Sequence, residues 1–133
     1  MGAISSKSLL TTGGSFGSWA TIARPTIDAT TAAQIVEALA RAERPVLYAG
    51  GGVISAHATA ELAALAEALE LPVAHTLMGK GCMHEDHPLL LGQTGFWGLP
   101  ISNDTCRDAD LILAVGTRLA EANSSSWDAR FTF

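Results

Sequence analysis

The stretch RPVLYAGGGVISAHATAELAALAEAL, residues 44–69, decides the fold. Its apolar run Val46–Ala49 predicts a short strand, and leucines at helical spacing predict a helix from about Ala56 to Glu70 with Ser55 as its N-cap. The turn between them is Gly50–Gly52. Such a turn favours contact with a phosphate, because glycine lets a ligand approach the backbone and a helix N-terminus offers free N–H groups. The alternative is a tight turn that needs glycine for its own geometry.

Helices and strands alternate along the rest of the chain. The pattern predicts a helix that Asp28 or Thr30 caps and that runs to about Glu43, the strand Val73–Thr76, a loop-rich stretch over 77–100, a helix at 101–108 and the strand Leu111–Val115. The last strand is unbroken in its apolar character, which is typical of a parallel strand covered on both faces. Asp108 and Asp110 are interpreted as helix-end and strand-start residues. The alternation predicts an α/β fold, a doubly wound, Rossmann-like parallel sheet with right-handed connections.

Composition narrows the possible classes of protein. The chain has 133 residues, of which 48% are apolar and 16% are charged, so it is long enough for one domain with a core. The formal net charge of −5 argues against a nucleic-acid partner, which needs a basic face. No apolar run approaches the roughly 20 residues of a membrane span. Cys82 and Cys106 form no CxxC pair, and we interpret both as reduced thiols in a cytoplasmic protein.

The chain divides into two regions by composition. Residues 1–27 contain no Asp or Glu and many Ser, Thr and Gly, which is typical of a flexible arm or linker. Ordinary globular sequence follows, and residues 28–133 are expected to form the domain.

Three segments are expected to meet at one edge of the sheet. Gly50–Val53, Thr76–Gly81 and Gly116–Ala120 each follow an apolar strand directly, and in an open parallel sheet ligands bind at the carboxyl ends of the strands. GGGVIS is not the dinucleotide fingerprint GxGxxG, since Ser55 stands in place of the third glycine. The second strand ends in His75 and Thr76, without an acidic residue for a ribose hydroxyl. These departures disfavour NAD, and the glycines alone do not decide between contact with a phosphate or diphosphate and a turn that needs glycine for its own geometry.

Four motifs in order, RPVLYAGGG, PVAHTLMGKG, HPLLLGQTG and DADLILAVGTR, resemble the central domain of thiamine-diphosphate-dependent enzymes, with acetolactate synthases and their carboligase and decarboxylase relatives as the most similar group. The resemblance covers roughly residues 28–120. It implies a DHS-like FAD/NAD-binding variant of the Rossmann-like fold. It also implies a parent enzyme whose two flanking domains hold thiamine diphosphate and Mg²⁺, one supplying an activating Glu and the other a GDG motif with a downstream Asn. Neither motif is identifiable in this chain, so we expect a scaffold with no catalytic residue of its own.

The resemblance also implies positions for a cofactor of the central domain, which is FAD or ADP in some members. The matching residues are Gly51, Gly52, Thr76, Leu77, Met78, Gly95, Gly116 and Arg118. His75 stands where a small residue is usual, and the last loop reads GTRLAEANSSSW in place of an acidic pair and an arginine. The alternative to a scaffold is a free-standing FAD- or ADP-binding or regulatory module.

The resemblance further implies that the sheet is truncated at its carboxyl-terminal edge, because a further strand of the type IHIDID is missing after the last motif. An open strand edge invites pairing with another chain. We therefore expect a homo-oligomer, or a tail that covers this edge.

Other constellations support weaker hypotheses. The run Cys82–His87 groups possible metal ligands, but structural zinc usually needs a second distant cluster, so a polar loop is preferred and no metal site is predicted. Phe96 and Trp97 can stack on a ring, although an interface or core anchor is the preferred interpretation. A triad of Ser124–Ser126, His75 and Asp128 lacks any GxSxG nucleophile elbow and is set aside.

Overall fold

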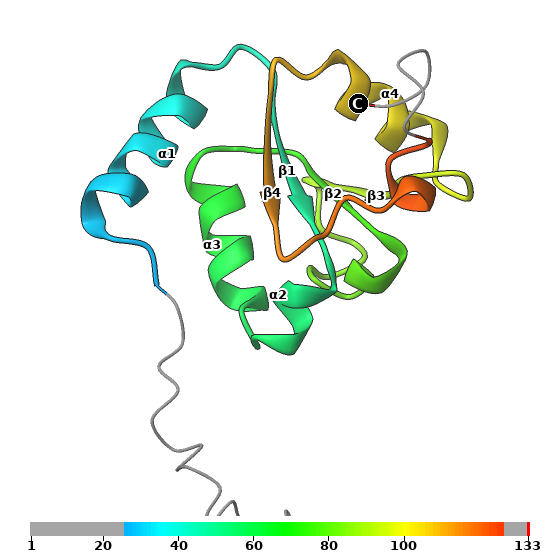
Figure 1. Cartoon of the computed structure of the whole chain (residues 1–133), viewed down its shortest axis with the longest axis horizontal. Coiled ribbons are helices and arrows are strands. Elements are labelled where there is room, and N and C mark those ends of the chain that lie inside the picture. Colours follow the sequence, from blue (N-terminus) through cyan, green and yellow to red (C-terminus); the bar gives the residue numbers. More distant parts are fainter. Residues whose placement is uncertain (1–25, 127–132) are drawn as a thin grey trace, which may run out of the picture.

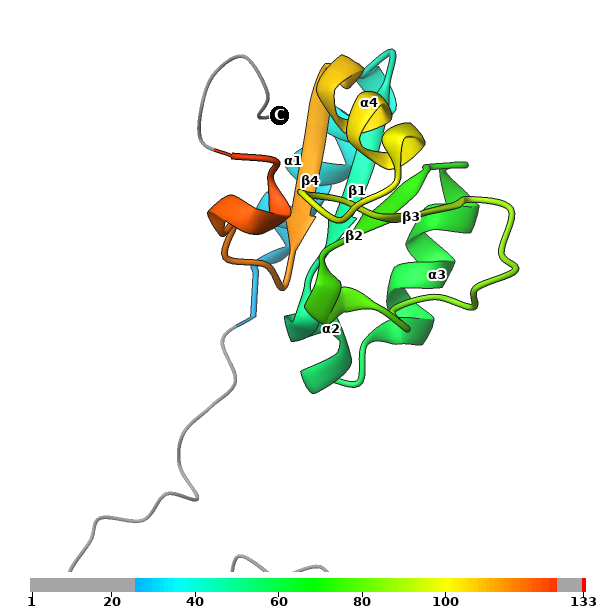
Figure 2. The ribbon, with the colours of Figure 1, turned by 90° about the vertical axis from the view of Figure 1, so that its right-hand side faces the viewer.

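A sheet of four parallel strands forms the centre of the protein in the computed structural model, which describes residues 26–126 and 133 (Figures 1 and 2). The strand order is β3-β2-β1-β4. The strands are β1 (Pro45–Ala49), β2 (Val73–His75), β3 (Leu90–Gln93) and β4 (Leu111–Val115). All three pairings are parallel, so the predicted doubly wound α/β class is confirmed.

Helices pack against both faces of the sheet. They are α1 (Ala29–Arg41), α2 (Gly51–Ser55), α3 (Thr59–Ala68) and α4 (Pro100–Asp108), with the short 3₁₀ helices η2 (Leu77–Gly79) and η3 (Glu121–Asn123) at strand exits. Leu39 of α1, Val53 of α2 and Leu62 of α3 join one core cluster, whereas Cys106 of α4 joins the other. Among the described residues, no helix has the length and apolar character needed to cross a bilayer.

Strand β1 has the deepest burial because it lies inside the sheet. Leu47 and Ala49 point into the cluster beneath α1 and α3, and Val46 and Tyr48 point into the cluster beneath α4. All four side chains are buried. The unbroken apolar run that predicted this strand therefore reflects cover on both faces.

Strand β4 differs from the expectation of full cover. It pairs with β1 on one side, and among the described residues no strand lies on its other side. Its residues are half-buried, and Ala114 is exposed. Both of its faces are partly covered, since Leu113 packs against one core cluster and Ile112 against the other, and Ala114 alone of its residues is exposed.

The segment after the glycines forms two helices rather than one. Helix α2 begins at Gly51, and His57 with its positive φ of 57° separates it from α3. Ser55 is not an N-cap, because it ends α2 and its Oγ donates to Gly51 O at 3.1 Å. By contrast, of the two predicted caps Asp28 is confirmed, since its Oδ1 accepts the Thr31 N–H at 2.9 Å, whereas Thr30 lies inside the helix.

Strand β3 was expected to be part of a loop. It pairs with β2 through Val73 opposite Leu90, and the register shifts before Ala74 pairs with Gly92. Gly92 has φ of +103°, which fits an irregularity in the strand. This glycine and the shortness of the apolar run hide the strand from a periodicity argument.

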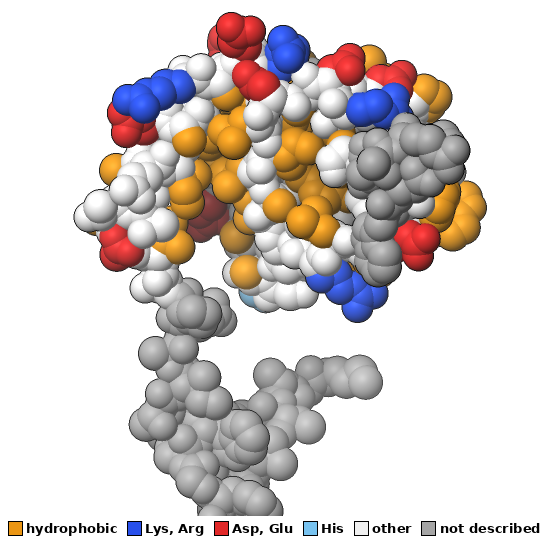
Figure 3. Space-filling view, turned by 45° about the horizontal axis from the view of Figure 1, so that its top comes forward, with side chains coloured by type: hydrophobic (Ala, Val, Ile, Leu, Met, Phe, Trp, Pro, Cys, Tyr) orange, Lys and Arg blue, Asp and Glu red, His pale blue; other side chains and the backbone are white. Residues whose placement is uncertain are grey.

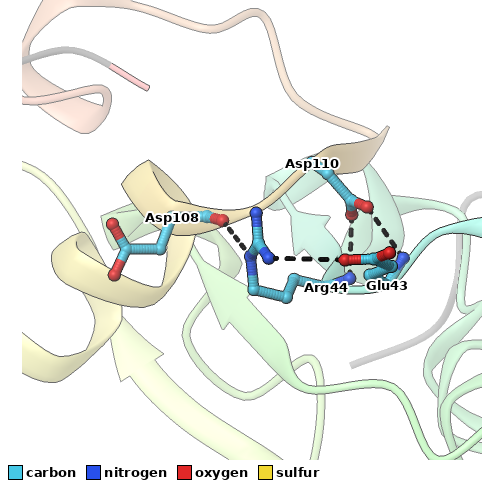
Figure 4. Close-up of polar contacts among 4 residues, drawn as sticks. All are labelled: Glu43, Arg44, Asp108 and Asp110. Carbon is cyan, nitrogen blue, oxygen red and sulfur yellow. Dashed lines mark hydrogen bonds and ion pairs between the residues drawn. The ribbon is translucent and has the colours of Figure 1, made fainter.

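A carboxylate joins the amino ends of β1 and β4 (Figure 4). Asp110 accepts the backbone N–H groups of Glu43 at 2.7 Å and Arg44 at 2.9 Å, while Arg44 Nε donates to Asp108 O at 2.7 Å. The bond from Glu43, followed by the bond from Arg44, lowers the pKa of the Asp110 carboxyl below its ordinary value. Asp108 and Asp110 therefore end a helix and begin a strand, as the sequence indicates.

Replacement of Asp110 is expected to change how the thermal stability of the protein depends on pH. Because the pKa of Asp110 is lowered by folding, its contribution to stability is present above the unfolded pKa of about 4 and is lost as the pH falls through the folded value. We expect Asp110→Asn to lower the Tm at neutral pH and to reduce the fall of Tm below about pH 4. Thermal melts over a pH series measure both effects. Asp86→Asn is the matched control, because that side chain is 94% exposed and should leave the profile unchanged.

Candidate functional site: the carboxyl rim

The four strand exits lie at one edge of the sheet because all the strands are parallel. We call this edge the carboxyl rim. It comprises Gly50–Gly52 after β1, Thr76–Gly79 after β2, Thr94–Gly95 after β3 and Gly116–Arg118 after β4. Figure 1 shows α2 and the end of β4 at this same edge.

The glycine turn packs directly against the exit of β4. Gly50 N–H donates to Val115 O and Gly52 N–H donates to Gly116 O, both at 2.8 Å. A Cβ on Gly52 would lie 2.7 Å from Gly116 Cα, so the two backbones touch. The structure thus brings Gly52 and Gly116 together. This close approach of the two backbones is by itself sufficient reason for glycine at these positions.

The backbone donors expected for a phosphate are partly used within the chain. Helix α2 has only five residues. Gly52 N–H is bonded to Gly116 O, and Val53 N–H donates to Gly50 O at 3.2 Å. An anion at this turn would therefore meet fewer free N–H groups than a long helix offers.

The exit of β2 lies beside Gly51. A Cβ on Gly51 would lie 3.0 Å from Met78 Cβ, so these two predicted residues are neighbours. Leu77 and Met78 are 54% and 74% exposed and form an apolar surface on the rim. Thr76 is buried, and its Oγ1 accepts the Gly79 N–H at 3.1 Å, so its side chain caps η2.

Gly95 and Arg118 differ in their accessibility. Gly95 is buried, and Asn103 bonds both its N–H at 2.9 Å and its carbonyl at 3.0 Å. A Cβ on Gly95 would collide with Ala122 O, so η3 covers the glycine on its open side. Arg118 is exposed at the other end of the rim, and no ion pair with a described residue involves its guanidinium.

A buried polar network, not identified from the sequence, fixes η3 on the rim. Tyr48 Oη donates to Asn123 O at 2.9 Å, and Thr94 Oγ1 lies 3.0 Å from Tyr48 Oη and 2.9 Å from Asn123 O. Burial raises the pKa of the Tyr48 hydroxyl. The sequence does contain one indication of this network, which is a tyrosine in an otherwise apolar strand. A buried phenol hydroxyl usually has a hydrogen-bond partner.

The run Cys82–His87 divides between core and surface. Cys82 and Met83 are buried in the cluster beneath α3, whereas Glu85 pairs with Lys80 at 3.1 Å on the surface. Within residues 26–126 and 133, no three His, Cys, Asp or Glu side chains are grouped to hold a metal ion.

The aromatic pair after β3 lies on the surface. Phe96 and Trp97 are 59% and 76% exposed, with ring centroids 6.3 Å apart. The core-anchor interpretation is therefore wrong, and stacking or an interface role stays open. Of the triad set aside earlier, Asp128 lies outside the described residues.

The chain belongs to the family described as thiamine pyrophosphate enzyme, central domain, whose model matches residues 32–133. It is 48% identical over 83 residues to a probable acetolactate synthase large subunit of Methanocaldococcus jannaschii, covering 62% of this chain and 14% of the relative. It is 41% identical over 104 residues to the acetolactate synthase large subunit of Parasynechococcus marenigrum, covering 78% and 17%. It is 44% identical over 92 residues to the glyoxylate carboligase of Escherichia coli O157:H7, covering 68% and 16%. The resemblance inferred from the four motifs is confirmed.

The matches span only 14% to 17% of the length of these relatives. The family depends on thiamine diphosphate, and this chain corresponds to its central domain, with further domains flanking it in the relatives.

Proposed function

We propose that this chain is the scaffold domain of a thiamine-diphosphate-dependent 2-oxo acid carboligase or decarboxylase related to acetolactate synthase. Thiamine diphosphate and Mg²⁺ would be held by flanking domains, as the family resemblance implies. The observation that carries the proposal is the family match across residues 32–133. In this proposal, residues 1–27 act as an arm or linker and residues 28–133 form the domain.

The chemistry available on the rim supports binding rather than catalysis. His75 is 2% exposed, and its Nδ1 donates to Thr76 O at 2.8 Å, so the imidazole is directed into the fold. Arg118 offers a guanidinium, which has N–H donors for an anion and no hydrogen-bond acceptor. The accessible rim is otherwise glycine backbone and apolar side chains, which suit packing and anion contact.

A nucleotide cofactor, FAD or ADP, is the second part of the proposal. Leu77 and Met78 present apolar area for a flat ring, and Arg118 offers a guanidinium for a phosphate. Gly51, Gly52, Thr76, Gly95 and Gly116 complete the set of rim residues proposed from the resemblance. Since Gly52 N–H is already bonded, Arg118 would provide most of the attraction for the diphosphate.

Ligand-dependent melting tests whether this scaffold domain also holds a nucleotide. We expect FAD or ADP to raise the Tm of the chain and NAD to leave it unchanged, because a ligand that binds only the folded state stabilises it by about 2.7 kcal/mol at a hundred times its Kd. Arg118→Gln should abolish the shift, whereas the control Arg107→Gln should keep it, because Arg107 pairs with Asp104 on α4. No shift with any of the three nucleotides would refute the nucleotide site and leave an inert scaffold.

Catalytic independence is tested separately. The isolated chain with thiamine diphosphate, Mg²⁺ and pyruvate is expected to give no turnover above buffer. Turnover that persists in a repurified sample would contradict the assignment as a scaffold domain.

Two further parts of the proposal concern location and assembly. Both cysteines are buried free thiols, which supports the cytoplasm as the compartment. Among the residues that the structure describes, no strand pairs with the outer side of β4, which supports the proposed self-association.

A further inference from the structure

The chain that follows β4 crosses the carboxyl rim to the exit of β3. It turns at Leu119, which has a positive φ of 51° and whose N–H donates to Thr117 Oγ1 at 3.2 Å. It then forms η3, in which Ala122 O accepts the Phe96 N–H at 3.1 Å. Since the strand order is β3-β2-β1-β4, the crossing passes the ends of β1 and β2 on its way (Figure 1). We call residues 119–124 the strap.

Buried hydrogen bonds hold the strap on the rim. Asn123 O accepts the Tyr48 Oη–H at 2.9 Å and lies 2.9 Å from Thr94 Oγ1. Tyr48 and Thr94 are 0% and 1% exposed, so these hydroxyls are shielded from water. Ser124, at the end of the strap, is buried too. Separating a carbonyl from buried donors costs free energy, and these bonds therefore favour the closed position of the strap.

The closed strap fills the space over the exit of β3. A Cβ on Gly95 would collide with Ala122 O and would lie 2.9 Å from Asn123 Cα, so the strap rests on the glycine itself. A ligand on the rim therefore cannot reach Gly95 while the strap is closed.

The other strand exits remain accessible. Leu77 and Met78 after β2 are more than half exposed, and Arg118 after β4 is exposed. Figure 3 shows Lys or Arg side-chain atoms at the lower margin of the described domain, which is the margin that carries the rim in Figure 1. The exits of β2, β1 and β4 together span about 10 Å, because neighbouring strands lie about 4.8 Å apart.

This length of rim offers places for one ring and one diphosphate. The apolar side chains of Leu77 and Met78 suit a flat ring, and the guanidinium of Arg118 suits a phosphate. A nucleoside diphosphate has these two parts. A dinucleotide such as FAD has a second ring, and the next place along the rim is the exit of β3, which the strap covers.

We propose that the strap sets the class of ligand that the rim accepts: in its closed position it admits a nucleoside diphosphate such as ADP and excludes the second ring of FAD. FAD binds only after the strap has left Gly95, so its apparent affinity is reduced by the fraction of molecules in which the strap is open. ADP binds without this cost. The inference rests on the proposed nucleotide site, which it narrows from two ligands to one.

Titration of the 133-residue chain with ADP and with FAD, followed by thermal melting and by flavin fluorescence, measures this preference. We expect ADP to bind about tenfold more tightly than FAD or better, because opening the strap breaks the bonds to Asn123 O. Tyr48→Phe removes one of these bonds and keeps the ring. It should tighten FAD binding by about fivefold and leave ADP binding unchanged.

Ser102→Ala is the matched control for Tyr48→Phe. It also removes a buried hydroxyl, which donates to Leu91 O at 2.8 Å and has no hydrogen bond to the strap. Both nucleotide affinities should stay as they are in the parent chain.

Amide hydrogen exchange shows whether the variant is folded and its strap loosened. In Tyr48→Phe the amides of Asn123 and Ser124, which donate to Ala120 O, should exchange faster while the amides of β1 keep their protection. If the exchange of the strap amides is unchanged, the double variant Tyr48→Phe/Thr94→Val removes both hydroxyls and takes its place in the titration.

Three results would overturn the proposal. The first is equal affinity of the unmodified chain for ADP and FAD, and the second is a loosened strap that leaves the preference unchanged. The third is tight FAD binding that Trp97→Ser removes, which would place the flavin on the exposed aromatic pair. A chain that binds neither nucleotide would refute the nucleotide site itself, so the failure of the proposed site is distinguished from the failure of the strap to select its ligand.

Discussion

Gly50→Ala is expected to destabilise the domain by about 3 kcal/mol or more, at the upper end of what overpacking of a protein interior costs. The added Cβ would lie 2.6 Å from Thr117 Cα and closer still to Gly116 O. Both obstacles are backbone, and Gly50 is fixed to β4 through Val115 O at 2.8 Å, so neither side can move away without parting β1 from β4. Chemical denaturation monitored by circular dichroism measures the loss.

Gly81→Ala is the matched control for this substitution. Gly81 has φ of +87° and no atom within 4 Å of an added Cβ, so alanine there meets backbone strain without a collision. We expect a loss of about 1 kcal/mol, which is the usual cost of a left-handed residue with a side chain. Gly50 has the opposite combination, which is a collision without backbone strain, since its φ of −107° is accessible to any residue. Equal losses at the two positions would contradict the contact argument.

Met83→Ala is expected to cost about 3 kcal/mol in the free energy of unfolding, which is typical of a buried methionine replaced by alanine. Met83 is 5% exposed and packs in the core cluster beneath α3 together with Cys82. The loss comes from a cavity that the surrounding strands and helices cannot close. Urea denaturation at fixed pH provides the measurement.

Replacement of the neighbouring His84 tests whether the run Cys82–His87 acts through packing or through metal binding. The side chain of His84 is 81% exposed, so His84→Ala should change stability by less than about 0.5 kcal/mol. Added Zn²⁺ should leave the Tm of the parent chain unchanged. A rise in Tm with Zn²⁺ that His84→Ala removes would show that this run is a metal site after all.

Local patterns in the sequence were sufficient to predict the helices and strands that are regular or have a side-chain cap. The strand after Arg44, the cap at Asp28 and the strand Leu111–Val115 follow from apolar runs and a single side-chain oxygen, and the structure has all three. Strand β3 was missed because Gly92 and a register shift break its periodicity. The division of α2 from α3 was missed because it depends on a left-handed His57, a residue type that gives no strong warning of that conformation.

The sequence predicted which edge of the sheet holds the candidate site, but not which groups are in contact there. Parallel strands must end at one edge, so the sequence brought Gly51, Met78, Gly52 and Gly116 to a common rim. Spacing along the chain contains no information about which groups meet there. Only the packing shows that Gly52 N–H is bonded to Gly116 O and that η3 covers Gly95.

The sequence by itself determined the class of fold and the family, because alternating apolar runs and ordered motifs are properties of the chain read in one direction. The tertiary structure alone decided that LILAV pairs with β1, that Cys82 and Met83 belong to the core, and that the glycines close on one another. These facts depend on contacts between residues far apart in the chain. Burial and backbone approach are set by such long-range neighbours, and no local pattern specifies them.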